Sequence, residues 1–325
     1  MADISESAPR PGTASPPTAA TGSALLADRL SKRKARTLWT DAWNQYRRHH
    51  LALVGTFVLL AIIIAVAVGP FVYTENGQAL DVANAMQGPT LAHPMGLDDL
   101  GHDILARILV GGRRSITVGI MAMLVSITLG TLIGAVAGYF GGLIDSLLMR
   151  FTDLFLALPV LPLLLLIIYL YRDKLKALFG LETGMMILII AVIGGFAWMG
   201  VARLVRASFL ALKEKEFIEA ARCIGASTPS IIFKHILPNS LTPVIVAATI
   251  QVGGAIITES SLSFLGLGFP PDVPTWGSML FDAKDQLPFA PHMALFPGMA
   301  IFIVVLSINY MGDGLRDALD PHARR

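Results

Sequence analysis

The segment Glu216-Phe217-Ile218-Glu219-Ala220-Ala221-Arg222-Cys223-Ile224-Gly225 lies between two long apolar stretches of the chain. Its residues are mostly polar or helix-forming, and the chain favours helix from Phe209 onward. Gly225 is placed to end this helix in a left-handed cap. Thr228-Pro229 then supplies an N-cap and a proline at the first helical position. The sequence therefore predicts a helix, a sharp turn and a second helix that stops before Pro238.

The composition is that of a membrane protein. Of 325 residues, 54% are hydrophobic and 15% are charged, whereas a soluble globular chain has about 25% charged residues. The net charge of +2 is too small to indicate nucleic-acid binding. The single cysteine, Cys223, excludes an internal disulfide.

Six apolar stretches are long enough to cross a bilayer, for which a helix needs about 20 residues. Pro159 and Pro162 interrupt the third, which we expect to be a kinked span. The chain is thus predicted to be an all-α polytopic membrane protein with six transmembrane helices. These lie near residues 51–71, 115–138, 150–171, 184–204, 241–262 and 293–312.

The distribution of Lys and Arg predicts the orientation of these spans. Regions 1–50, 139–150, 201–240 and 313–325 together hold 18 of the 25 basic residues. Since cytoplasmic segments are enriched in Lys and Arg, both termini and the 201–240 region are expected in the cytoplasm. The loops at 72–114 and 263–292 then face outward. In these loops we expect a separate surface helix at 104–110, ahead of Arg113-Arg114, and an interfacial anchor at Trp276.

The inner segment resembles a motif of a known family. Glu219-Ala220-Ala221, Gly225 and Leu237-Pro238 have the spacing of the "EAA" loop in permease subunits of ATP-binding-cassette importers. Further stretches resemble the dipeptide and oligopeptide (peptide/nickel-type) permeases, in particular the second, shorter member of the permease pair. These are His93-Pro94-Met95-Gly96-Leu97-Asp98-Asp99-Leu100-Gly101-His102-Asp103, Ala137-Gly138-Tyr139-Phe140-Gly141-Gly142, Leu262-Ser263-Phe264-Leu265-Gly266-Leu267-Gly268, Pro274-Thr275-Trp276-Gly277-Ser278-Met279 and Gly312-Asp313-Gly314-Leu315-Arg316-Asp317.

This resemblance implies a type I (MetI-like) importer permease core with an additional N-terminal span. Residues 1–40, whose first 24 are poor in large apolar groups, are expected to be a disordered cytoplasmic tail. Residues 41–112 form the N-terminal segment with the first span and an extracytoplasmic loop. Residues 113–313 form the core, with a coupling loop at about 207–240, and residues 314–325 a cytoplasmic tail.

The resemblance also implies an inner-membrane assembly. Its other members would be a second, non-identical permease, two cytoplasmic ATPase subunits or a fused pair, and an extracytoplasmic solute-binding protein. The chain has no Gly-x4-Gly-Lys phosphate loop, since none of its lysines follows a glycine. No catalytic cluster, metal site or cofactor is predicted, and ATP is expected on the partner subunits.

The resemblance assigns coupling to the ATPase to the inner segment. Glu219 is the leading candidate for a polar contact, Ala220 and Ala221 would allow close approach, and Gly225 would set the turn. In a structural alternative, Glu219 pairs with Arg222 or Lys215, and such a pair stabilises the helix by only tenths of a kcal/mol. The full coupling set is Glu219, Ala220, Ala221, Arg222, Gly225, Leu237 and Pro238.

Two features within the spans have both structural and functional interpretations. Gly130, Gly134 and Gly138 share one helix face, which favours tight packing within the subunit over a pore lining. Glu259 is an intramembrane carboxyl, a type of residue that is often functional. A structural carboxylate satisfied by Thr258 and Ser260 is an equally good interpretation.

Two other functional classes compete with the importer. An ion-coupled carrier or channel would need ionisable residues in mid-span and commonly has inverted repeats, and few such charges are found. A membrane-embedded enzyme would need a catalytic cluster. The solute, whether a dipeptide, an oligopeptide, a nickel chelate, an opine or glutathione, is not determined by these motifs.

Overall fold

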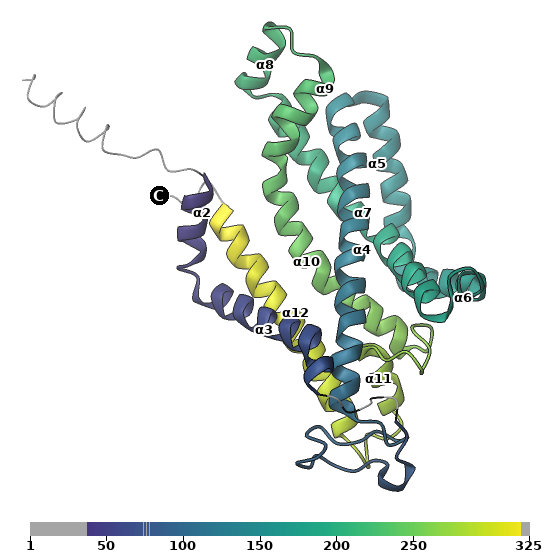
Figure 1. The fold of residues 1–325 in the computed structure, drawn as a ribbon. Helices are drawn as coiled ribbons and strands as arrows, with labels where there is room; N and C mark the ends of the chain where they lie inside the picture. Colours follow the sequence, from purple (N-terminus) through teal and green to yellow (C-terminus); the bar gives the residue numbers. More distant parts are fainter. Residues whose placement is uncertain (1–37, 74, 76, 78, 320–325) are drawn as a thin grey trace, which may run out of the picture.

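The computed structural model describes residues 38–73, 75, 77 and 79–319, a set of helices joined by loops (Figure 1). Most of the predicted N-terminal tail and residues 320–325 lie outside this part, whereas residues 38–40 already belong to a helix. The helices are α2 (Leu38–Tyr46), α3 (His50–Val72), η1 (Val82–Asn84), α4 (Ile104–Phe140), α5 (Gly142–Ala157), α6 (Val160–Phe179), α7 (Leu181–Lys213), α8 (Glu216–Cys223), α9 (Thr228–Ser230), η2 (Ile231–Ile236), α10 (Leu237–Phe264), α11 (Trp276–Ala283) and α12 (His292–Leu319).

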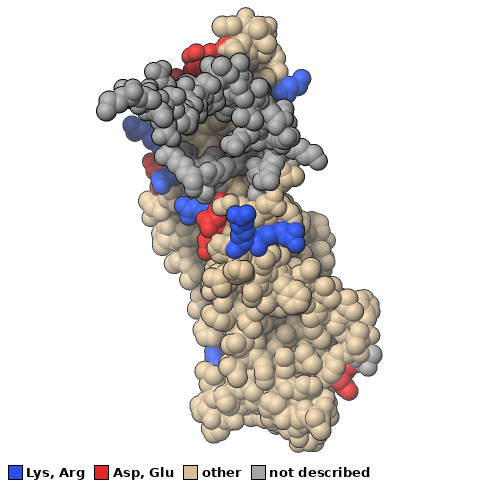
Figure 2. Space-filling view, turned by 90° about the vertical axis from the view of Figure 1, so that its left-hand side faces the viewer, with Lys and Arg blue, Asp and Glu red and all other residues tan. Residues whose placement is uncertain are grey.

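Within the described residues, five helical segments are long and apolar enough to span a membrane. They are α3, α4, α7, α12 and the continuous run from Thr228 to Phe264, and the bent pair α5–α6 makes a sixth when counted as one span. Figure 2 shows a broad band of surface almost free of charged side chains below a group of Lys and Arg. This band fits the hydrocarbon layer, which charged side chains avoid.

The third span differs from its prediction in extent and in the size of its bend. It begins at Gly142 instead of residue 150 and ends at Phe179, and its two arms meet at 85°. The bend lies at Leu158, whose backbone is extended, because the residue before a proline avoids the helical region. The predicted kink is confirmed, and it is sharp enough to send α6 sideways from the bundle (Figure 1).

The separate surface helix predicted at 104–110 is wrong, since α4 runs unbroken from Ile104 to Phe140. Arg113 lies within this helix, where its guanidinium donates hydrogen bonds to backbone carbonyls of the neighbouring helix α3. Its Nε donates to the carbonyl of Val66 (2.9 Å) and its Nη2 to that of Ala67 (2.6 Å). Val66 lies four residues before Pro70, which has no N–H to donate. Arg113 thus satisfies a carbonyl that proline leaves free within the membrane.

The interfacial role predicted for Trp276 is also wrong. Its side chain is 1% exposed, and its indole Nε1 donates to the carbonyl of Ile108 (3.1 Å). It begins α11, where the Thr275 hydroxyl accepts from the N–H of Ser278 in a capping box. The Pro-rich loop before it therefore folds back and packs against the outer end of α4.

Glycines on one face of α4 allow α7 to approach very closely. A Cβ atom on Gly130 would lie 2.6 Å from Cβ of Val201, and one on Gly138 would lie 2.6 Å from Cβ of Phe209. A Cβ on Gly134 would collide with the carbonyl oxygen of Ala202. The geometry favours the packing interpretation of these three residues over the pore interpretation.

We predict that Gly134→Ala destabilises the assembled protein by about 1–3 kcal/mol, because the new methyl group has no room against α7. Gly200→Ala on α7 is the matched control, since among the described atoms nothing lies within 4 Å of its added Cβ. That control should be neutral or slightly stabilising. Thermal unfolding of both purified variants tests this. Equal midpoints would contradict close packing at Gly134.

Candidate functional site

The inner segment projects beyond the bundle as a short helical elbow (Figure 1). The single helix predicted from Phe209 to Gly225 is broken in the structure, because α7 ends at Lys213 and α8 starts at Glu216. The left-handed conformation predicted for Gly225 is confirmed by its φ of 84°. The N–H of Ala226 donates to the Ala221 carbonyl (3.0 Å) and that of Gly225 to the Arg222 carbonyl (2.9 Å), which is a Schellman cap.

The second helix of the elbow starts and ends differently from its prediction. Its N-cap is Ser227, one residue before the predicted Thr228, and the helix passes through Pro238 into α10. The intervening η2 is a π-helix in which the N–H of Leu237 reaches the carbonyl of Ile232, five residues back. Such wide turns shift the carbonyls that the ring of Pro238 would otherwise meet. Thr228–Phe264 is therefore one continuous helical run.

One face of α8 packs against this chain and the other is exposed. Ile218 (0% exposed) is buried in a cluster with Phe209 and Ile231, and Ala221 (5% exposed) is also buried. Ala221 thus contributes to the core of the elbow and not to its surface. The remaining members of the predicted coupling set are exposed, except Leu237, which is partly buried: Glu219, Ala220, Arg222, Gly225 and Pro238.

The exposed surface of the elbow carries three large apolar side chains that the sequence analysis did not single out. Phe217 is 45% exposed, Ile224 86% and Phe233 64%. Phe217 and Ile224 could have been found as apolar residues seven positions apart, a spacing that places both on one side of the predicted helix. Large exposed apolar side chains on a segment that projects from the bundle are typical of a protein-binding surface.

Glu219 is available for a partner. Across the described part of the chain, its carboxylate forms no ion pair with Arg222, Lys215 or any other basic residue. The structural alternative for Glu219 therefore lacks the contact on which it depends.

Glu259 connects α10 to α4 directly, and to α11 through Ser115, near the C-terminal end of α10. Its side chain is fully buried and accepts hydrogen bonds from the hydroxyls of Ser115 on α4 (3.2 Å) and Ser263 (2.8 Å). Ser115 Oγ also accepts from the N–H of Trp276 at the start of α11 (3.3 Å). The hydroxyls differ from those predicted, because Thr258 donates to the carbonyl of Gly254 instead. The contacts nevertheless favour a structural carboxylate.

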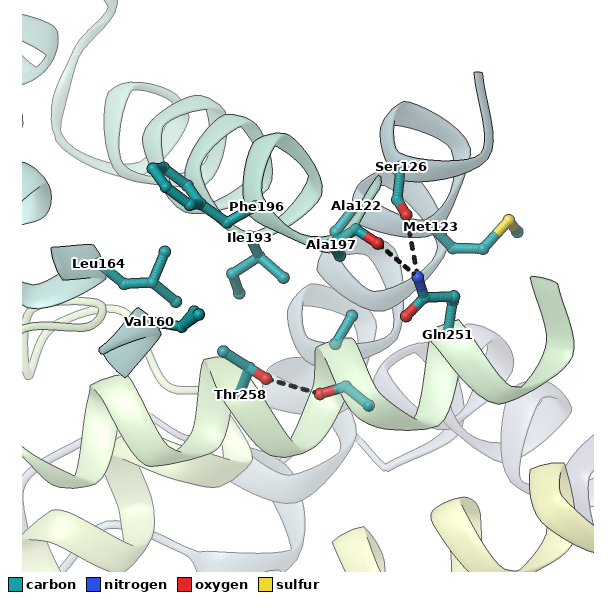
Figure 3. A pocket seen from close by; sticks show the side chains of 12 residues that line it. Ala122, Met123, Ser126, Val160, Leu164, Ile193, Phe196, Ala197, Gln251 and Thr258 are labelled. Atoms are coloured by element: carbon teal, nitrogen blue, oxygen red, sulfur yellow. Dashed lines mark hydrogen bonds between the residues drawn. The ribbon is translucent and has the colours of Figure 1, made fainter. Parts of the chain in front are cut away.

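A cavity of about 150 Å³ lies between α4, α6, α7 and α10, within the membrane part of the bundle (Figure 3). Its wall is mostly apolar, with Ser126, Gln251 and Thr258 as polar members. The Gln251 amide nitrogen donates to Ser126 Oγ (3.0 Å) and to the carbonyl of Ala197 (2.8 Å). One α10 side chain thus connects α4 and α7. Its amide oxygen accepts no hydrogen bond from the described residues.

The family follows from comparison with known proteins. A family model described as "Binding-protein-dependent transport system inner membrane component" matches residues 130–325. This chain is a permease of that family. A second model, the "N-terminal TM domain of oligopeptide transport permease C", matches residues 37–89. The permease is thus a multi-pass inner-membrane subunit of an importer, which confirms the prediction over the carrier and channel alternatives.

Curated relatives cover nearly the whole permease. "Glutathione transport system permease protein GsiD" of Pectobacterium atrosepticum is 41% identical over 293 residues, which are 90% of this chain and 94% of that protein. The protein of the same name from Escherichia coli is 40% identical over 289 residues, 89% of this chain and 92% of that one.

A solved structure supports the fold. The inward-facing MetNI methionine ABC transporter matches with a TM-score of 0.52 and 18% identity, over 67% of this permease and 96% of the solved chain. This confirms the predicted MetI-like core with an additional N-terminal span.

The outer-loop motif of the permease forms a buried polar cluster around Asp98. This carboxylate forms an ion pair with Arg107 and accepts hydrogen bonds from His102 Nδ1 (2.9 Å) and from the N–H of Leu100 (2.9 Å). Arg107 also donates to Asp282 Oδ2 (3.4 Å) of α11. Burial raises the pKa of Asp282, and the positive charge of Arg107 opposes the rise. The cluster therefore fastens the loop to both α4 and α11.

Asp103, the last residue of the motif, starts α4. Its Oδ1 caps the helix by accepting from the N–H of Ala106 (2.8 Å). Its Oδ2 binds both the hydroxyl of Tyr73 (2.8 Å) and Nδ1 of His93 (2.8 Å). Burial and then the Asp103 carboxylate raise the pKa of Tyr73. The contacts of the motif are thus structural, within the described part of the permease.

We predict that Arg107→Met destabilises the permease by about 3–5 kcal/mol, because it leaves the carboxylate of Asp98 buried without its cation. The loss should shrink as pH falls. Burial raises the folded-state pKa of Asp282, and the charge of Arg107 opposes this rise. Without Arg107 the pKa of Asp282 rises further, so as pH falls this carboxyl is protonated more readily in the folded state than in the unfolded state, which restores stability. Thermal unfolding at several pH values measures both effects.

Arg114→Met is the matched control on the same helix. Arg114 pairs with Glu182 (2.6 Å), whose side chain is 49% exposed, and donates to the carbonyl of Pro274 (3.3 Å). An ion pair with an exposed partner and one long hydrogen bond contribute about 1 kcal/mol each or less, so the loss should stay below that of Arg107→Met. Equal losses in the two variants would contradict the structural role of the Asp98 cluster.

Proposed function

We propose that the elbow formed by α8 and the Gly225 turn is the surface by which a separate cytoplasmic ATPase drives this permease. The observation that carries the proposal is the exposure of Phe217, Ile224 and Phe233 on the same projecting elbow as Glu219, which has no ion pair among the described residues. Exposed apolar side chains together with a free charge on a projecting segment are typical of a protein interface. Ala220, Arg222 and Pro238 border the same surface, and the buried Ala221 and partly buried Leu237 support it from beneath.

The elbow can transmit a displacement because it is continuous with a span. The helical run Thr228–Phe264 has 37 residues, about 55 Å at 1.5 Å per residue. It passes Gln251 at the membrane cavity and ends past Glu259 at the outer face. A push on the elbow therefore moves both ends of the helix. Coupling requires such an element, which a site at each end can bias between two packings.

The permease itself is non-catalytic in this proposal. ATP is bound by two ATPase subunits or a fused pair, and the pathway is completed by a second, unlike permease. An extracytoplasmic binding protein delivers the solute. Both termini and the elbow lie in the cytoplasm, as the excess of Lys and Arg in those regions supports.

The solute is a small peptide or a glutathione-like molecule. The matched relatives are named for glutathione transport and one family model for oligopeptide transport, and these names support the assignment. The mostly apolar cavity near Gln251, with few polar groups, suits passage of peptides with varied side chains. Equilibrium binding of dipeptides, oligopeptides and glutathione to the partner binding protein separates the candidates.

We predict that Glu219→Lys and Gly225→Pro each lower ATP-dependent uptake at least about tenfold, as expected when a central interface contact is lost. Lysine reverses the charge offered to the ATPase. Proline cannot adopt the positive φ of Gly225. Co-purification of the ATPase and uptake into vesicles test both variants, with membrane insertion checked alongside.

Glu214→Lys is the control for charge reversal, because Glu214 is exposed in the short break between α7 and α8. It should keep ATPase association and uptake. The coupling role fails if Glu219→Lys transports like this control.

A second prediction concerns the apolar part of the surface. Ile224→Asp should weaken ATPase association by about tenfold or more, because it places a charge where the interface excludes water. Folding should be unaffected, since Ile224 is 86% exposed. Titration of purified ATPase against the variant in nanodiscs measures the affinity, and unchanged binding would remove Ile224 from the interface.

A further inference from the structure

An apolar groove is lined by residues of α2, α3 and α12. Figure 1 shows α2 and the C-terminal end of α12 displaced toward the end of the bundle that carries α8. Its volume is about 320 Å³. The N-terminal α2 forms one wall and the last turns of α12 the other. The lining residues are Ala42, Trp43, Tyr46, Thr56, Met311, Leu315, Ala318 and Leu319.

The wall of the groove offers almost nothing to a polar ligand. The hydroxyl of Tyr46 contacts that of Thr56, and Thr56 Oγ1 donates to the carbonyl of Ala52 (2.7 Å). These polar atoms are therefore already satisfied within the protein, and the other lining side chains are aliphatic apart from the thioether of Met311 and the ring of Trp43. Such a groove suits an alkyl chain, because an apolar surface gains free energy when it is covered by another apolar surface.

Unpaired positive charge borders the same groove. The guanidinium of Arg47 lies 5.9 Å from the ring centre of Trp43, a lining residue that is 57% exposed. Within the described residues neither Arg47 nor Arg48 forms an ion pair, and the neighbouring Asp317 pairs with His49 (3.7 Å). Figure 2 shows a group of basic side chains directly above the uncharged band of the surface.

The sequence just before α2 is also basic. Lys32, Arg33, Lys34 and Arg36 precede it within a few residues. Basic clusters next to a transmembrane helix favour binding of anionic lipid headgroups. A tryptophan beside them is typical of the membrane–water interface. Both the positive charge beside the groove and its apolar lining therefore point to the same type of ligand.

We propose that this groove is a binding site for an anionic phospholipid. One acyl chain occupies the apolar groove between α2 and α12, and the headgroup phosphate is bound by Arg47 with Arg48 beside it. The bound lipid holds the amphipathic α2 against the end of α12. This lipid site is independent of the coupling role of the elbow.

The test uses photoreactive lipids in nanodiscs that contain the whole transporter. Phosphatidylglycerol and phosphatidylcholine, each with a diazirine in the acyl chain, are cross-linked and the adducts mapped by peptide mass spectrometry. In the native protein, adducts on α2 and on residues 311–319 should favour phosphatidylglycerol. Since each arginine near the surface contributes about fivefold to the affinity, Arg47→Gln with Arg48→Gln should abolish most of that preference.

Arg150→Gln is the matched control, because Arg150 is exposed and, within the described residues, also without an ion pair. It lies on α5, outside the groove, and its loss should leave the preference unchanged. Equal labelling by the two lipids in the native protein would overturn the proposal, as would an unchanged preference in the double variant. A photoreactive residue at Leu315 that cross-links to residues 1–37 or to another subunit, and not to lipid, would overturn it as well.

Discussion

The close contact of α4 with α7 is the interaction on which the rest of the permease depends. Backbone meets backbone at Gly130, Gly134 and Gly138, where even a methyl group would collide with α7. A helix pair packed this closely can shift only as one body. Arg206 of α7 also binds Asp145 of α5 (2.6 Å), which adds the third span to this body. The position of α7 then determines where α8 leaves the bundle.

In the proposed mechanism, α10 is the element that moves against this body. Its side-chain hydrogen bonds to α4 and α7 involve Gln251 and, nearer its C-terminal end, Glu259. It also packs closely on α4, where a Cβ on Gly119 would lie 2.7 Å from Cγ1 of Ile256. Its own glycines, Gly253 and Gly254, bring no neighbouring helix closer than ordinary van der Waals distance. The hydrogen bonds of Gln251 are therefore contacts that an inward–outward transition would break and remake. The elbow at the other end of the same helix is where an ATPase would drive the inward–outward transition.

The sequence predicted what depends on local chemistry. The apolar runs, the turn at Gly225, the bend at Pro159 and the glycine face of α4 were all visible in it. It did not predict features that depend on distant partners. Arg113 was placed outside the second span in the prediction because its acceptors on α3 lie about 47 residues away. The indole of Trp276 was expected at the interface because its acceptor, the carbonyl of Ile108, is remote in sequence. Pro238 was expected to end a helix because proline normally does so. The π-helical turns of η2 that accommodate it were not predicted from the sequence.

Cys223 allows a direct measurement of whether α8 lies against an ATPase in the cytoplasm. It is the only cysteine of the chain and is exposed on α8. A short cysteine-reactive photo-cross-linker placed there in the intact transporter should form adducts with the ATPase subunit. The adduct yield should change between the nucleotide-free and vanadate-trapped states. Absence of ATPase adducts in every state, or labelling of Cys223 by an impermeant reagent from outside the cell, would contradict the account.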